Sequence, residues 1–309
     1  MFKKSLYPAL ACFILAAAPL AARADVILQH TYEGGNDHGY GISVGPTQDF
    51  GISQAAAGRS GNNLSVAITT NFDGDAVDNS IVTFGDLFLA KTWTPFGTGP
   101  AFLQDTYANG TQWQFGVQAN GLTDQAAINA QAQAAASGND TTISGSADLY
   151  AITSPSNVIL SYVADPNKSC DIEFNCWIWR DGQPVQVATN ATTTLDANGN
   201  VVGPGVDANG NPLPQTLASV FSTNASWTYT ATPDGLDDVL TYTFDASNTG
   251  LLIGDDDWDM AMSWAMTCAN DIIQGEIGQV PEPSSLALLL AGLVGAGLFV
   301  RRRVTARIA

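Results

Sequence analysis

Carboxylates are the side chains of this sequence that are most concentrated in positions suited to chemistry. Asp73, Asp75 and Asp78 share one turn region, and Asp255 and Asp257 belong to a denser acidic run near the end of the chain. Calcium takes six to eight oxygen ligands at about 2.3–2.6 Å, and turns of this kind can supply them. No Glu stands at the twelfth position counted from Asp73, so this region does not complete an EF-hand loop. A structural calcium ion and a solvated acidic turn both remain open, and no other cofactor is expected.

Tryptophans offer a second kind of chemistry. Trp177 and Trp179 are two residues apart, so on a strand both side chains point to the same face. Such a pair either packs into the core or forms an aromatic platform for a glycan. Burial distinguishes these two interpretations.

We find no known catalytic motif in the sequence. The sequence contains no Gly-x-Ser-x-Gly elbow, Walker loop or dinucleotide-binding loop. Glu33, Glu173 and Glu276 belong to no recognisable motif. We therefore expect a protein that is not an enzyme. A secreted hydrolase remains a third hypothesis, and it would need a cleft with two carboxylates about 5–10 Å apart.

The distribution of charge excludes one class of partner. The chain has 309 residues with 29 acidic and 11 basic side chains. Between residues 25 and 279 only Arg59, Lys91, Lys168 and Arg180 are basic, against 28 acids, which gives a formal charge near −24. Phosphate backbones are repelled by such a surface, so nucleic-acid binding is not expected.

The N-terminus has the three parts of a secretory signal peptide. Residues 1–4 are short and basic, residues 7–20 are apolar, and Ala22-Arg23-Ala24 fits the small-x-small cleavage pattern. We therefore assign residues 1–24 to a signal peptide and expect export.

Export places the cysteines that remain in an oxidising compartment. Cys170 and Cys176 flank a short loop, and we predict a disulfide between them. Cys268 is then left over, as a free thiol or a site of intermolecular pairing. Pairing of Cys268 with either of the other two is the alternative.

The C-terminus combines a short motif, an apolar stretch and a basic cluster. Pro281-Glu282-Pro283 precedes the uninterrupted apolar run 286–300, and Arg301, Arg302 and Arg303 follow at once. The run is near the lower length limit for a spanning helix, and the arginines place the tail on the cytoplasmic side. These features predict a transmembrane helix that anchors an exported body.

This C-terminal pattern resembles the PEP-CTERM sorting signal, over residues 280–304. The resemblance implies a Gram-negative bacterium that makes extracellular polysaccharide. It also implies processing by an exosortase, a membrane protease-transpeptidase, with Glu282 acting in recognition. A plain tail anchor is the alternative. The resemblance concerns how the protein is handled and does not extend to residues 25–279.

The body alternates short β-type runs with polar turns, which predicts an all-β fold of the β-sandwich or jelly-roll-like type. The expected strands are 26–32, 63–70, 80–90, 111–118, 147–152, 157–163, 176–180, 226–231, 239–244 and 258–267. One Ala/Gln-rich segment, 123–136, predicts a short helix capped by Thr123 and ended by Gly138, with a flexible loop as the alternative.

We expect one continuous domain over residues 25–279, although the irregular stretch 195–214 is a possible hinge. The expected role is a structural or adhesive component of the cell surface or extracellular polysaccharide matrix. Its partners would be the exosortase during processing, then polysaccharide or other surface proteins, with transient attachment to the inner membrane through the tail. A carbohydrate-binding module is the alternative.

Overall fold

The computed structural model describes the larger part of the predicted body. The described residues are 26–28, 51–73, 83–96, 107–161, 183–190, 194–195, 201–206, 212–253, 257–267, 269 and 271–278. The predicted signal peptide and sorting tail lie outside these ranges. So does the predicted strand 176–180.

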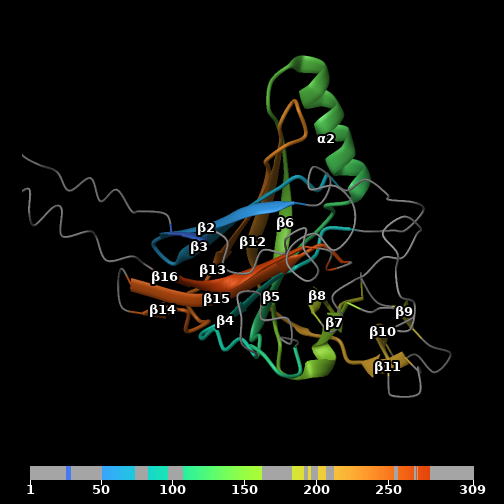
Figure 1. Cartoon of the computed structure of the whole chain (residues 1–309). Helices are drawn as coiled ribbons and strands as arrows, with labels where there is room; N and C mark the ends of the chain where they lie inside the picture. The colour runs from blue at the N-terminus through green and yellow to red at the C-terminus, as the bar shows by residue number, and fades with distance from the viewer. Residues whose placement is uncertain are drawn as a thin grey trace, which may run out of the picture.

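Most described strand residues belong to a single eleven-stranded sheet in which all neighbouring strands are antiparallel (Figure 1). In their order across the sheet these strands are β1 (Val26–Leu28), β2 (Ile52–Ser60), β3 (Asn63–Thr70), β13 (Asp238–Asp245), β12 (Ser219–Ala231), β6 (Thr141–Ala151), β5 (Phe115–Ala119), β4 (Leu87–Ala90), β15 (Asp257–Ala265) and β14 (Leu252–Ile253), and β16 (Ile272–Gly278) pairs with β15. The predicted all-β fold with one short helix is thus confirmed.

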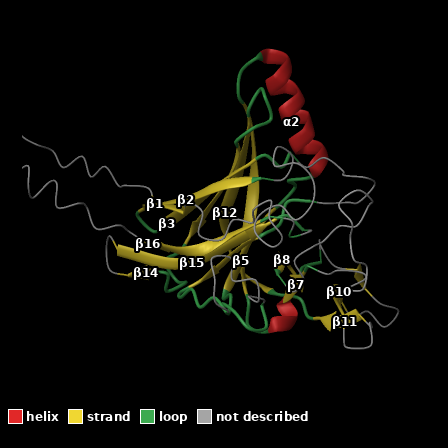
Figure 2. Ribbon diagram, in the orientation of Figure 1, coloured by secondary structure: helices red, strands yellow, loops and turns green. Residues whose placement is uncertain are grey.

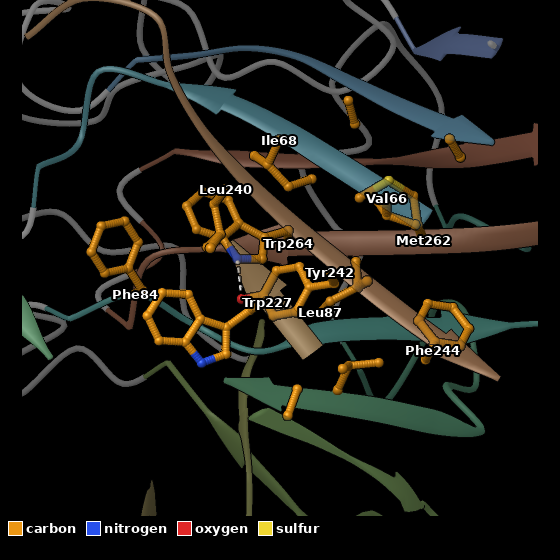
Figure 3. Packing of buried hydrophobic residues seen from close by; sticks show 14 of the residues in the cluster. Val66, Ile68, Phe84, Leu87, Trp227, Leu240, Tyr242, Phe244, Met262 and Trp264 are labelled. Carbon is orange, nitrogen blue, oxygen red and sulfur yellow. Dashed lines mark hydrogen bonds between the residues drawn. The ribbon is translucent and has the colours of Figure 1, made fainter. Parts of the chain in front are cut away.

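The sheet bends over, so that its two halves face each other across one apolar core. Phe84, just before β4, stacks edge-on against Phe72 after β3 and against Tyr229 of β12, with ring centroids 5.0 and 5.6 Å apart. Trp264 of β15 donates a hydrogen bond to the hydroxyl of Tyr242 of β13, 3.3 Å away (Figure 3). The facing layers of the sandwich therefore come from one continuous sheet.

The two ends of the bent sheet also come together. Strand β16 lies against β1 and β2. The buried carboxylate of Asp271 accepts a hydrogen bond from the backbone N–H of Ile52 at 2.8 Å and from that of Ile272 at 2.9 Å. One side chain thus links the start of β2 to the start of β16.

The α-helix of the described residues, α2 (Asp124–Ser137), stands at one end of the sheet (Figure 2). The Thr123 side chain accepts a hydrogen bond from the N–H of Ala126, and Gly138 ends the helix in the left-handed conformation. Ala127, Ala130 and Ala134 share the buried face of the helix, which packs against β6 and β12. The predicted caps are confirmed, and a flexible loop is excluded.

Two smaller sheets complete the described structure. Strands β7 (Val158–Leu160) and β8 (Pro184–Val187) form a pair, preceded by the 3₁₀ turn η1 (Pro155–Asn157). Strands β9 (Thr194–Leu195), β10 (Val201–Val206) and β11 (Pro212–Gln215) form the second small sheet, where the sequence predicted an irregular stretch.

No helix in the ranges that the structure describes is long and apolar enough to cross a membrane. The predicted spanning segment 286–300 lies outside those ranges.

Gly85 sits where the two halves of the sheet and the β7–β8 pair meet. Its carbonyl oxygen accepts hydrogen bonds from the Tyr242 hydroxyl at 3.0 Å and from the Trp264 indole at 3.1 Å. A Cβ at this position would lie 2.0 Å from the carbonyl oxygen of Ala265 and 2.8 Å from that of Val185. The backbone therefore leaves no room for a side chain here.

We predict that Gly85→Ala lowers the free energy of unfolding by at least about 3 kcal/mol, because two backbone carbonyls must move. Gly61→Ala is the matched control. Gly61 has a φ of +62° and nothing within 4 Å of the added Cβ, so we expect a cost of about 1 kcal/mol. Urea denaturation of both variants measures the difference. Equal costs for the two substitutions would contradict the steric account of Gly85.

Candidate functional site

The predicted calcium ligands are only partly placed. Asp73 lies after β3, near enough to Tyr229 for its charge to raise the pKa of that phenol. Asp75, Asp78 and Asp255 lie outside the described residues. Asp257 is described only as part of the backbone of β15.

The acidic groups at this end of the sheet are used in local hydrogen bonding. The buried carboxylate of Asp238 accepts from the Tyr229 hydroxyl at one oxygen. Its other oxygen accepts from the N–H and the hydroxyl of Thr232, at 2.7 and 2.8 Å. Burial, followed by the hydrogen bond to Asp238, raises the pKa of Tyr229 well above its ordinary value, so the phenol stays protonated as a donor. Asp238 thereby closes the turn between β12 and β13.

Among the described residues, these carboxylates do not form a metal-binding site. No group of three or more His, Cys, Asp or Glu side chains there is placed to hold a metal ion. A calcium site that uses Asp75, Asp78 or Asp255 stays a prediction.

The tryptophans of the described residues serve the core. Trp113, Trp227 and Trp264 are buried, and Trp93 is half-buried. Trp227 also donates its indole N–H to the carbonyl oxygen of Asn120 at 2.9 Å. None of these four tryptophans is therefore exposed as a platform. Trp177 and Trp179 lie outside it, and their role stays a prediction.

Five adjacent strands carry a surface that the sequence analysis did not identify. On the side away from the core, β2, β3, β13, β12 and β6 present uncharged and mostly small side chains in cross-strand rows, and we call this surface the hydroxyl face. Its members are Gln54, Ala56, Gly58, Ser65, Ala67, Thr69, Val239, Thr241, Thr243, Ser226, Thr228, Thr230, Thr142, Ser144 and Ser146.

Hydrogen bonds between neighbouring hydroxyls tie the strands of this face together. Ser65 and Thr243 approach to 3.0 Å, and Thr142 and Thr230 also approach to 3.0 Å. Neighbouring strands are about 4.8 Å apart, so the hydroxyls repeat at that interval across the face. Each hydroxyl both donates and accepts, which suits contact with water or with a neutral, hydroxyl-rich polymer. Alternating Ser and Thr in 141–146 is the sequence signal that would have indicated this face.

A buried polar network lies on the outward side of the other half of the sheet, between β4, β5 and β8. Asp86 accepts hydrogen bonds at one carboxylate oxygen from the Val187 N–H at 2.7 Å and from the Gln118 amide at 3.2 Å. The Gln118 carbonyl oxygen accepts from the Thr189 hydroxyl at 3.0 Å. Burial raises the pKa of Asp86 to about 7, although the two hydrogen bonds act in the opposite direction. The sequence signal was a lone acid at the start of an apolar strand.

The remaining predicted sites lie outside the described residues. They are the disulfide between Cys170 and Cys176, the leftover Cys268, and the sorting residues Pro281, Glu282, Pro283, Arg301, Arg302 and Arg303.

Comparison with known proteins identifies one segment of the chain. Residues 279–303 match the family model of the PEP-CTERM protein-sorting motif. No curated protein and no solved structure matches the chain.

We predict that Asp238→Asn lowers the free energy of unfolding by about 2–3 kcal/mol, because an amide would turn one acceptor into a donor that faces a buried donor. Asp245→Asn is the control, since Asp245 accepts from the Ser247 N–H in an exposed turn and an amide oxygen can replace it. We expect that control to cost less than about 1 kcal/mol. Chemical denaturation compares the two. A cost for Asp238→Asn as small as that of the control would show that the turn does not depend on this carboxylate.

Proposed function

This chain carries a PEP-CTERM protein-sorting motif, and on that premise we propose that its body is a structural or adhesive component of the cell surface or extracellular polysaccharide matrix. The motif implies recognition by an exosortase, export, and a transit stage anchored in the membrane. Final residence in a polysaccharide matrix, and a Gram-negative host with a biofilm, are parts of the proposal.

The observation that carries the proposal is the hydroxyl face. Fifteen consecutive outward positions over five strands carry no charge, in a body whose formal charge is near −24. Copies of such a body repel one another where their charges meet, whereas the uncharged face can approach a hydrated, neutral polymer at no electrostatic cost. Hydroxyls that donate and accept give many weak contacts, which suits a matrix component better than a pocket-type receptor.

The alternative, a carbohydrate-binding module built on exposed tryptophans, has less support. Trp113, Trp227 and Trp264 are buried in the core, so this alternative depends on the other tryptophans, above all Trp177 and Trp179. Lack of enzymatic activity stays part of the proposal.

We predict that replacing Pro281, Glu282 and Pro283 together by Ala leaves the protein in the membrane fraction, because the exosortase would lose its recognition sequence. Glu276→Ala is the control, since Glu276 is an exposed acid of β16 just before the motif. Cell fractionation and immunoblotting of the producing cells measure the distribution. Release of the triple variant to the same extent as the control would argue against exosortase processing at this motif.

We also predict saturable binding of the processed protein, collected outside the producing cells, to the polysaccharide of the same cells. Binding is measured with calcium and with a chelator in place of calcium. Calcium-dependent binding would assign a role to the Asp clusters. If binding is independent of calcium and is lost in the double variant Thr228→Lys/Thr241→Lys, the binding surface is the hydroxyl face. Loss in Trp177→Ala plus Trp179→Ala would favour the alternative, and no binding in any condition would contradict the proposal.

A further inference from the structure

The β7–β8 pair forms a separate layer on the outer side of β4, β5 and β15. Val158 and Val187 pack with Phe88 and Tyr150 in one apolar cluster. A second cluster joins Ile159, Val185 and Ala188 to Ala265 and Ile272 of the main sheet. This layer therefore covers apolar surface that would otherwise face water.

Asp86 is the polar link between this layer and the main sheet. Its backbone N–H donates to the Val185 carbonyl oxygen at 2.9 Å, and its side chain accepts from the Val187 N–H at 2.7 Å. The same carboxylate oxygen accepts from Gln118 of β5, whose other end is bound by Thr189 after β8. Asp86, Gln118 and Thr189 are all buried.

Charge compensation for this carboxyl is missing within the described part of the chain. The two cationic side chains described there are elsewhere. Arg59 donates to the Gly61 carbonyl oxygen in the β2–β3 hairpin, and Lys91 lies against Gly250 beyond the other end of β4. Moving a carboxylate into such surroundings costs far more than burying the neutral acid.

The titratable groups that face Asp86 add to this cost. Tyr150 of β6 and Tyr242 of β13 are coupled electrostatically to Asp86, and burial raises the pKa of both phenols, so they remain neutral. Asp148 of β6 lies in the same cross-strand row, beyond Gln118, and it carries like charge. The described residues of β8 and of β15 next to Asp86 contribute no titratable side chain.

We propose that Asp86 is a proton-controlled latch that holds the β7–β8 layer on the main sheet when its carboxyl group is neutral and loosens the layer when that group is charged. The layer is therefore predicted to be bound most firmly in an acidic matrix.

The direction of the pH dependence follows from the two states of the acid. In the opened state the carboxyl is exposed to water and titrates near the ordinary value of about 3.9. In the docked state burial raises its pKa to about 7. Between these two values docking takes up a proton, so docking weakens as the pH rises, by roughly tenfold per pH unit, and levels off above about pH 7.

Hydrogen exchange of the full-length chain in a mild detergent tests the latch. After correction for the intrinsic exchange rate, we expect the opening constant of the amides in 185–189 to rise about fiftyfold from about pH 5 to about pH 7. The amides of 239–244 in β13 are the internal reference, because they lie in the centre of the main sheet. The same rise in both segments would mean global unfolding and would overturn the latch.

Two variants distinguish the effect of ionising Asp86 from the effect of packing between the β7–β8 layer and the main sheet. Asp86→Asn keeps an acceptor oxygen and cannot ionise, so the amides of 185–189 should lose their pH dependence. Gly116→Ala places a Cβ 2.3 Å from a methyl carbon of Val187. It should therefore raise the opening constant of the amides in 185–189 at every pH and leave the dependence of that constant on pH unchanged. If the opening constant of these amides depends on pH in Asp86→Asn as it does in the unmodified protein, the proposal is overturned. If Asp86→Asn fails to fold, the proposal is tested by the unmodified protein alone, from the pH dependence of hydrogen exchange in 185–189 compared with that in 239–244.

Discussion

The close approach of three backbone segments at Gly85 is the constraint on which the rest of the described fold depends. The carbonyl oxygen of Gly85 receives hydrogen bonds from Tyr242 and Trp264, so it ties β13 to β15 across the core. On its other side, the missing Cβ lets the carbonyl oxygens of Ala265 and Val185 come near. At Gly85 these backbone segments therefore meet without an intervening side chain.

The core side and the outward side of the sheet carry different kinds of residue. Aromatic side chains fill the space around Gly85 between the facing halves (Figure 3). The outward side of β2, β3, β13, β12 and β6 carries small, uncharged side chains. The outward side of β4, β5 and β15 is instead covered by β7–β8, which encloses Asp86. The fold thus combines one bare surface with one covered surface on the same sheet.

Alternation of apolar and polar residues made part of this fold predictable. Strand 63–70 was predicted with its observed bounds, because every second residue points into the core. Strand β2 was missed, since Ala, Ser and Gly dominate its sequence and β-branched residues are nearly absent from it. Pairing with β3 along its whole length makes it a strand all the same. Strand β16 is also absent from the predicted strands, although Ile272, Ile273 and Ile277 are buried in it.

The candidate sites were less predictable than the strands. Asp86 and Gln118 lie 32 positions apart in the sequence, and only the pairing of β4 with β5 brings them together. The hydroxyl face likewise joins strands that are distant along the chain, so no local motif marks it. By contrast, the sorting motif is continuous in sequence, and its pattern could be recognised without a fold.

The last strand of the body has a mechanical consequence. Strand β16 ends at Gly278, and the match to the sorting motif begins at the next residue, 279, so the motif follows the sheet directly in the sequence. Any pull on the C-terminus enters the fold along β16, which is hydrogen-bonded to β15 over seven residues. A load in that direction shears all of these bonds together and does not peel them one at a time. A load along β16 is thus shared by the whole of its pairing with β15.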